Sequence, residues 1–183
     1  MKLLWRPVRQ INPASFPKDI RDFLLYTGSL TEHLEYYCRD DFNLELTCQS
    51  WQRPLIDEAK ILHIQDSRYA LIREIYLKCG NRRLVYGRSI IPAQTFTGAE
   101  RRLAYWGKRS LGDYLFTQRK AKRGSIEITR IPENHKLINL ASRNLPTGNK
   151  GGLWGRRSMF YIRNKPLLVV EIFLPDITKC KNI

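Results

Sequence analysis

The chain has 183 residues, of which 43% are hydrophobic, and its 32 Lys and Arg against 17 Asp and Glu give a net charge of +15. This length and composition suit one globular domain, residues 1–183, and no apolar run reaches the length of a membrane-spanning helix. The four cysteines and three histidines are scattered without metal-ligand spacing, and arginines interrupt the first residues where a signal peptide needs an apolar run. We therefore expect a cytoplasmic protein without a metal.

The basic charge leaves three kinds of partner open, namely nucleic acid, an anionic membrane surface and anionic small molecules. The Lys and Arg residues form short clusters along most of the chain, and none lies in a helix-turn-helix, RNP or zinc-finger signature. Solvated surface is the simplest interpretation of most clusters. Nucleic acid is therefore not an expected partner, and a weak contact with a membrane surface stays open.

In chain order, apolar periodicity and capping signals first predict two helices, at 15–28 and 29–38, the second with Ser29 and Glu32 in capping-box spacing. Later segments that read as strands are 42–51, 69–78, 83–92, 124–131, 158–163 and 166–175. Short helices are predicted at 98–107 and 110–116, and a long loop at 132–152. Strands dominate and short helices lie between them, which indicates an α+β domain with a mainly antiparallel sheet.

The hairpin that turns at Gly80-Asn81 predicts the positions of two arginines. With a two-residue turn, Arg73 lies directly opposite Arg88 in a stripe that is otherwise apolar. Like charges in opposite positions destabilise a hairpin, whereas two guanidiniums side by side suit an anionic ligand such as a carboxylate. In the alternative, structural interpretation, one arginine reaches solvent or pairs with an acid, for which Glu171 is a candidate.

Glu171 lies in "PLLVVEIFLP" (166–175), a nearly continuous apolar run that reads as a strand covered on both faces. On such a strand Glu171 shares a face with Val169 and Phe173. A charge in these surroundings is costly unless it is neutralised, paired or used. A structural ion pair and a functional carboxylate both fit the sequence. The second hairpin, which ends in this strand, is expected to turn at Asn164-Lys165.

Five fragments together resemble a known family: "SRYALIREIYL", "GRSIIP", "GKRSLGDYLF", "LWGRRSMF" and "KPLLVVEIFLP", in this order. The chain is similar to the chorismate lyases over roughly residues 20–175. The resemblance implies conversion of chorismate to 4-hydroxybenzoate and pyruvate for ubiquinone synthesis, by a cytoplasmic enzyme without a cofactor. It also implies an antiparallel sheet of about six strands, with two helical flaps over an internal ligand cavity. A monomer that is inhibited by its own product is expected.

The family's ligand-contact positions fall on Leu30, Arg73, Leu111 and Glu171. We expect Arg73 to bind a substrate carboxylate and Arg88 to bind the second carboxylate or the ether oxygen. Glu171 is expected to hydrogen-bond the substrate hydroxyl or to donate a proton to the leaving oxygen. The catalytic set predicted from the sequence is therefore Glu171, Arg73 and Arg88.

Leu30 and Leu111 share a local context, because each directly follows a serine that looks like a helix N-cap. The first N–H groups of a helix lack internal partners, so two helix starts aimed at one cavity offer donors to carboxylate oxygens. Two capped surface helices are the alternative. The chain departs from the family at Leu30, where a methionine is familiar, and in the long loop 132–152.

Two other functions are consistent with parts of this pattern. A non-catalytic domain of the same fold that senses a small anion accounts for the cavity, and a basic nucleic-acid-binding protein accounts for the net charge. The hypothesis of a nucleic-acid-binding protein does not account for an acid in an apolar strand together with paired arginines.

Overall fold

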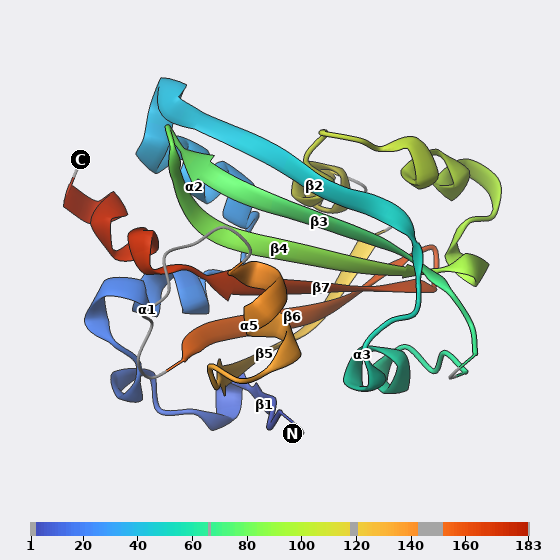
Figure 1. Cartoon of the computed structure of the whole chain (residues 1–183), viewed down its shortest axis with the longest axis horizontal. Coiled ribbons are helices and arrows are strands. Elements are labelled where there is room, and N and C mark those ends of the chain that lie inside the picture. The colour runs from blue at the N-terminus through green and yellow to red at the C-terminus, as the bar shows by residue number, and fades with distance from the viewer. Residues whose placement is uncertain (1–2, 66, 118–120, 143–151, 183) are drawn as a thin grey trace.

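The structure is a computed structural model that describes residues 3–65, 67–117, 121–142 and 152–182. Within these residues, strands form one sheet and the helices are short (Figure 1). The strands are β1 (Arg6–Pro7), β2 (Phe42–Gln52), β3 (Ala70–Cys79), β4 (Arg82–Pro92), β5 (Ala121–Ile131), β6 (Leu153–Ile162) and β7 (Lys165–Phe173). The helices are α1 (Lys18–Leu25), α2 (Leu30–Cys38), α3 (Ile56–Ile61), α4 (Leu111–Thr117) and α5 (Lys136–Ala141), with two longer 3-10 helices, η5 (Gly98–Tyr105) and η6 (Pro175–Asn182).

The sheet has the strand order β1-β5-β6-β7-β4-β3-β2, and every neighbouring pair is antiparallel. The predicted α+β class with an antiparallel sheet is confirmed. The sheet has seven strands in the described residues rather than about six, because the two-residue β1 pairs with β5 at one edge. Strand β7, which carries Glu171, lies at the centre of the sheet, between β6 and β4.

The predicted pairing of Arg73 with Arg88 is wrong. The turn is correct, with Cys79 opposite Arg82, but the pairing then skips Leu84, so that Leu77 lies opposite Val85. One extra residue in a strand moves every later side chain to the other face. Arg73 therefore lies opposite Ser89, and Arg88 lies opposite Glu74 on the other side of the sheet.

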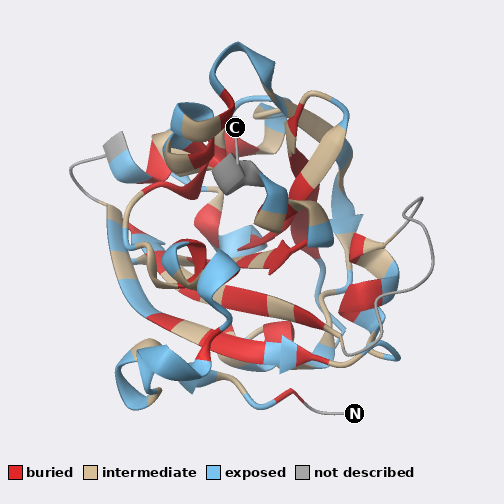
Figure 2. Ribbon diagram, turned by 90° about the vertical axis from the view of Figure 1, so that its left-hand side faces the viewer, coloured by how far each residue is buried: buried red, intermediate tan, exposed pale blue. Residues whose placement is uncertain are grey.

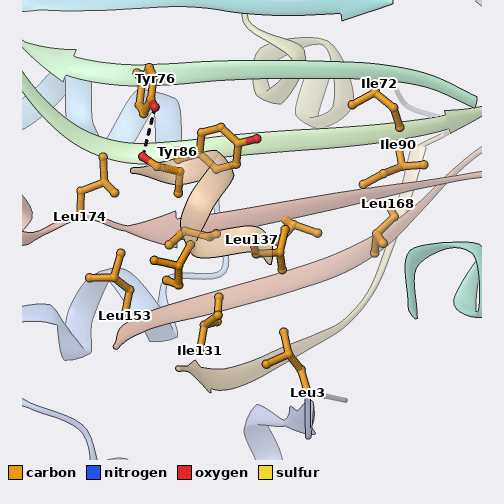
Figure 3. Close-up of a cluster of buried hydrophobic side chains, with 14 of the residues drawn as sticks. Leu3, Ile72, Tyr76, Tyr86, Ile90, Ile131, Leu137, Leu153, Leu168 and Leu174 are labelled. Atoms are coloured by element: carbon orange, nitrogen blue, oxygen red, sulfur yellow. Dashed lines mark hydrogen bonds between the residues drawn. The ribbon is translucent and has the colours of Figure 1, made fainter. Parts of the chain in front are cut away.

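One face of the sheet packs against α5 and against the segment that contains α3. Figure 3 shows this core, in which side chains from β3, β4 and β7 meet Leu137 of α5. The hydroxyl of Tyr76 on β3 donates to the carbonyl oxygen of Ala141 at 3.1 Å. The helix is thereby fixed to the sheet by both apolar contacts and a buried hydrogen bond.

The other face packs against α1, α2 and α4, through two further groups of buried side chains. Figure 1 shows α5 in front of the sheet and α2 behind it. In Figure 2 the buried residues follow the strands and the inner faces of the helices, while exposed residues cover the periphery. The sheet is thus a middle layer with helices on both sides.

The long loop predicted at 132–152 is only partly a loop. Residues 136–141 form α5, with the side chain of His135 accepting a hydrogen bond from the backbone N–H of Leu137 at its start. Residues 143–151 lie outside the described residues. Helix α3 was not predicted either. None of the helices in the described part of the chain is long and apolar enough to cross a membrane.

Candidate active site

The sheet face beneath α2 and α4 encloses a cavity. Its charged lining residues are Arg73, Arg123, Arg156 and Glu171, which come from β3, β5, β6 and β7. The remaining lining residues are mostly apolar or small: Gly28, Leu30, Thr31, Ile75, Leu77, Val85, Gly87, Ser89, Leu111, Gly112, Leu115, Phe116, Phe160 and Val169. Of the residues predicted for the site, Leu30, Arg73, Leu111 and Glu171 therefore line one cavity, and Arg88 is not among the lining residues.

Arg73 is buried and is held by backbone carbonyl groups. Its Nε and Nη2 atoms donate to the Gly107 oxygen at 3.2 and 3.1 Å, and Nη2 also donates to the Arg109 oxygen at 2.7 Å. No carboxylate of the described residues lies within 4.0 Å of it, and its Nη1 atom donates to none of those residues. Burial lowers the pKa of Arg73 to about 10, so the guanidinium stays charged at neutral pH.

Glu171 pairs with Arg156, which lies directly opposite it on β6. Arg156 donates from Nε and Nη2 to the two carboxylate oxygens at 2.5 and 3.2 Å, an arrangement that fits an ionised carboxylate. Its Nη1 atom donates to the carbonyl oxygens of Phe23 and Tyr26, at the end of α1. Arg156 therefore fixes the carboxylate in the cavity wall and joins it to the segment before α2.

Arg123 is the third arginine of the cavity. It donates from Nε to Ser158 Oγ at 3.0 Å and from Nη1 to the Thr27 oxygen at 2.8 Å. Its guanidinium carbon lies 5.3 Å from the ring centre of Phe160 and 5.7 Å from that of Phe116. Burial, with the nearby charge of Arg156, lowers the pKa of Arg123 to about 10.

The two predicted helix starts meet above the cavity. Ser29 Oγ accepts from the Glu32 N–H at 3.3 Å, and Ser110 Oγ accepts from the Asp113 N–H at 3.1 Å, so both predicted caps are present. Gly112 lies so close to α2 that a Cβ atom there would be 3.2 Å from the hydroxyls of Ser29 and Thr31. Leu30 and Leu111, both buried, follow these caps and face the cavity.

Arg88 belongs to a separate buried cluster on the opposite face of the sheet. It donates to both oxygens of Glu58 at 2.8 and 3.1 Å and also pairs with Glu74. Burial disfavours its charged form, but the hydrogen bonds and charge of Glu58 outweigh this effect and raise the pKa of Arg88 above its usual range. Glu58 also accepts from the Leu55 N–H at 2.8 Å at the start of α3. This cluster therefore holds α3 against the sheet.

Sequence reasoning missed Arg123 and Arg156 as cavity residues. A signal for Arg156 was present in the β6–β7 hairpin: its turn residues are Arg163 and Asn164, both with positive φ, and this turn places Arg156 opposite Glu171. The predicted turn at Asn164-Lys165 is one residue too late. For Arg123 no comparable signal exists, because β5 and β6 are far apart in the sequence.

Comparison with known proteins identifies the family of this chain. The family model described as chorismate lyase matches residues 1–182. The chain belongs to the chorismate lyase family. A relative from Methylococcus capsulatus, named "Probable chorismate pyruvate-lyase", is 42% identical over 150 residues, which cover 82% of this chain and 91% of the relative. One of the same name from Nitrosomonas eutropha is 34% identical, with 96% of this chain and 95% of the relative covered.

Solved structures share the chorismate lyase fold at low sequence identity. The effector domain of PhnF from Mycobacterium smegmatis has a TM-score of 0.55 and 17% identity, over 83% of this chain and 91% of that one. A GntR-family transcriptional regulator from Bacillus cereus also has a TM-score of 0.55, with 12% identity over 75% of this chain and 94% of that one. At these identities the likeness concerns the fold alone.

Proposed function

We propose that this protein is a chorismate lyase, which eliminates pyruvate from chorismate and leaves 4-hydroxybenzoate. The observation that carries the proposal, beside membership of the family, is the charge of the cavity. Three guanidiniums and one carboxylate line it, so it holds two positive charges in excess. Chorismate is a dianion with two carboxylates, and a closed cavity with this charge neutralises it.

Arg73 is proposed to bind the ring carboxylate of the substrate. Three hydrogen bonds to Gly107 and Arg109 fix its orientation, and Nη1 is left to donate. A preorganised guanidinium binds a carboxylate without losing much side-chain entropy. The N–H groups at the starts of α2 and α4 are proposed to assist, since they lie on the same cavity wall.

Glu171 is proposed to orient the substrate through its ring hydroxyl. A carboxylate that already accepts from Arg156 still has free lone pairs, so it can accept a hydrogen bond from that hydroxyl. In the elimination, the ring C–O bond to the ether oxygen breaks and the hydrogen on the neighbouring ring carbon leaves as a proton. The C–H electrons enter the ring, which becomes aromatic, and the enolpyruvate gains a proton to become pyruvate.

The apolar residues of the cavity supply the remaining requirements of such a reaction. Leu30 and Leu111 close over the ligand, and the wall that includes Val169 and Phe160 surrounds the ring. Exclusion of water and a fixed reactive conformer lower the barrier for an elimination that is already downhill. We further propose that the enzyme works as a cytoplasmic monomer without a cofactor, supplies 4-hydroxybenzoate for ubiquinone synthesis and retains this product.

The test is to incubate the purified protein with chorismate and to follow 4-hydroxybenzoate by absorbance and pyruvate by a coupled dehydrogenase. Equal amounts of both products are expected, at a rate that a chelator leaves unchanged. The variant Arg73→Ala serves as the control and should lose most of this activity. Binding of chorismate without turnover would instead identify a sensing domain, and activity that needs a divalent ion would contradict the reaction without a cofactor.

A further inference from the structure

The three arginines of the cavity differ in what already neutralises them. Arg156 uses Nε and Nη2 on Glu171 and Nη1 on two carbonyl groups. Neither Arg73 nor Arg123 has a carboxylate of the described residues within 4.0 Å. Each also has one terminal nitrogen that donates to none of the described residues: Nη1 in Arg73 and Nη2 in Arg123. Two guanidiniums without a counter-charge thus face a cavity that we assign to a substrate with two carboxylates.

The sheet places these two arginines on either side of Glu171. In the order β5-β6-β7-β4-β3, Glu171 is on the middle strand, Arg73 is two strands away on β3, and Arg123 is two strands away on β5. At about 4.8 Å between strands, each arginine begins roughly 10 Å from the strand of Glu171. Its long side chain covers part of this separation, and a ligand that lies over β7 can span the rest.

The cross-strand register brings the head of Arg123 to the level of Arg73. Residues directly opposite one another share a face, and the row that begins at Arg73 continues through Ser89, Val169 and Ser158. Ser158 Oγ is the group that accepts from Arg123 Nε. A ligand that lies across β7 therefore meets one guanidinium at each end of this row.

We infer that Arg123 binds the enolpyruvyl carboxylate of chorismate, while Arg73 binds the ring carboxylate. The inference rests on the proposed function and adds a specificity residue to it. The Nη2 atom of Arg123 can donate to the enolpyruvyl carboxylate while the bonds of Arg123 to Ser158 and Thr27 stay in place. Because 4-hydroxybenzoate lacks the enolpyruvyl group, Arg123 distinguishes substrate from product, and Arg73 does not.

Arg123 also lines a second pocket, which is more open to the surface than the cavity. This pocket is lined by Arg123 together with Pro7, Val8, Arg9, Thr27 and Ile126, among others. Arg123 is the only side chain among the described residues that lines both this pocket and the cavity. The enolpyruvyl end of the substrate therefore lies nearest to this surface pocket.

The experiment compares Arg123→Gln with wild type in two measurements: kcat/KM for chorismate, and the Kd of 4-hydroxybenzoate by calorimetry. We expect kcat/KM to fall about tenfold or more, since a charged hydrogen bond is lost, while the Kd changes less than about threefold. Arg73→Gln should weaken both. Arg101→Gln, which removes an exposed charge outside both pockets, should change neither.

Two results would overturn the inference. An equal loss of chorismate and 4-hydroxybenzoate binding would indicate that Arg123 only supports α2, and unchanged binding of both would indicate that it contacts neither. Should Arg123→Gln fold poorly, Arg123→Lys provides the same comparison, because it keeps the charge but not the anchored fork; it should still lose chorismate selectively. If wild type forms no pyruvate, the proposed function fails separately, and the ratio of chorismate to 4-hydroxybenzoate affinities still tests Arg123.

Discussion

Glu171 has apolar neighbours in the sequence and a charged neighbour in space. It lies in an apolar strand, yet Arg156 donates to both of its oxygens across the β6–β7 pair. The bond to Arg156 accounts for the stability of the charge, but it does not account for the position of that charge at a cavity. A purely structural pair has no need of a cavity wall, whereas a group that orients a ligand does.

The variant Glu171→Gln keeps the size of the side chain and removes its charge. We expect kcat to fall about 100-fold, because the amide is a weaker acceptor and holds the substrate hydroxyl less firmly in the reactive geometry. The Kd of 4-hydroxybenzoate should change little, because Arg73 still binds the carboxylate and the amide oxygen can still accept from the product hydroxyl. The control is Glu127→Gln, which breaks a similar pair with Arg157 on β5 and β6, outside the cavity. Wild-type turnover in Glu171→Gln would show that the carboxylate serves folding alone.

Arg88 illustrates the opposite case, a charge whose partners are all within the protein. Replacement by Met leaves Glu58 and Glu74 buried without a counter-charge, so we expect the free energy of unfolding to fall by about 3–5 kcal/mol. The control Lys179→Met breaks an exposed pair with Asp176 and should cost less than about 1 kcal/mol. Denaturant titration measures both, and a similar small loss for the two variants would contradict a structural role for Arg88.

At the scale of elements, α2 and α4, the two helices that cover the cavity and that we call its flaps, can approach each other closely because residue 112 is a glycine. The variant Gly112→Ala places a methyl group 3.2 Å from the hydroxyls of Ser29 and Thr31, so the starts of α2 and α4 must separate by a few tenths of an ångström. We expect weaker binding of 4-hydroxybenzoate and its faster release, measured by calorimetry and stopped-flow. Gly124→Ala, whose methyl group meets an ordinary contact at 3.4 Å, is the control. Unchanged release in Gly112→Ala would show that the helix starts do not close the cavity.

The elements themselves were largely predictable from the sequence, and their pairing was less so. The helices before residue 39, the antiparallel sheet and both serine caps follow from local signals that act over a few residues. The bulge at Leu84 has no such signal, since it depends on how β4 packs against β7 as well as β3. One skipped residue was enough to move Arg88 from the cavity to the other face.

The residues of the candidate site also divide into those that the sequence predicted and those that it did not. Arg73 and Glu171 stood out because a charge in an apolar strand needs a reason, and Leu30 and Leu111 followed from the family resemblance. Arg123 lies in a strand with many polar residues, where one more arginine is unremarkable, and only the three-dimensional fold brings it to the cavity. Sequence patterns thus identify polar residues in apolar elements more readily than cavity residues from mixed ones.

At the scale of the whole molecule, the sheet separates two buried sets of charges that are balanced differently. On one face, Arg88 is surrounded by two carboxylates of the protein. On the other, the cavity has more guanidiniums than carboxylates, and the missing negative charge must come from a ligand. Each flap is hydrogen-bonded to one of the two arginines that lack a carboxylate partner among the described residues. Arg73 donates to Gly107 and Arg109 in the segment before α4, and Arg123 donates to Thr27 before α2.

This arrangement leads us to expect that the product slows the enzyme. 4-Hydroxybenzoate keeps the ring carboxylate and the hydroxyl, so Arg73, Glu171 and the helix starts can hold it nearly as well as the substrate, and only the contact with Arg123 is lost. A cavity that closes over its substrate must reopen before the product leaves, and such opening often limits turnover. Progress curves with and without added 4-hydroxybenzoate measure the effect. If micromolar to millimolar product leaves the initial rate unchanged at sub-saturating chorismate, the cavity does not retain its product.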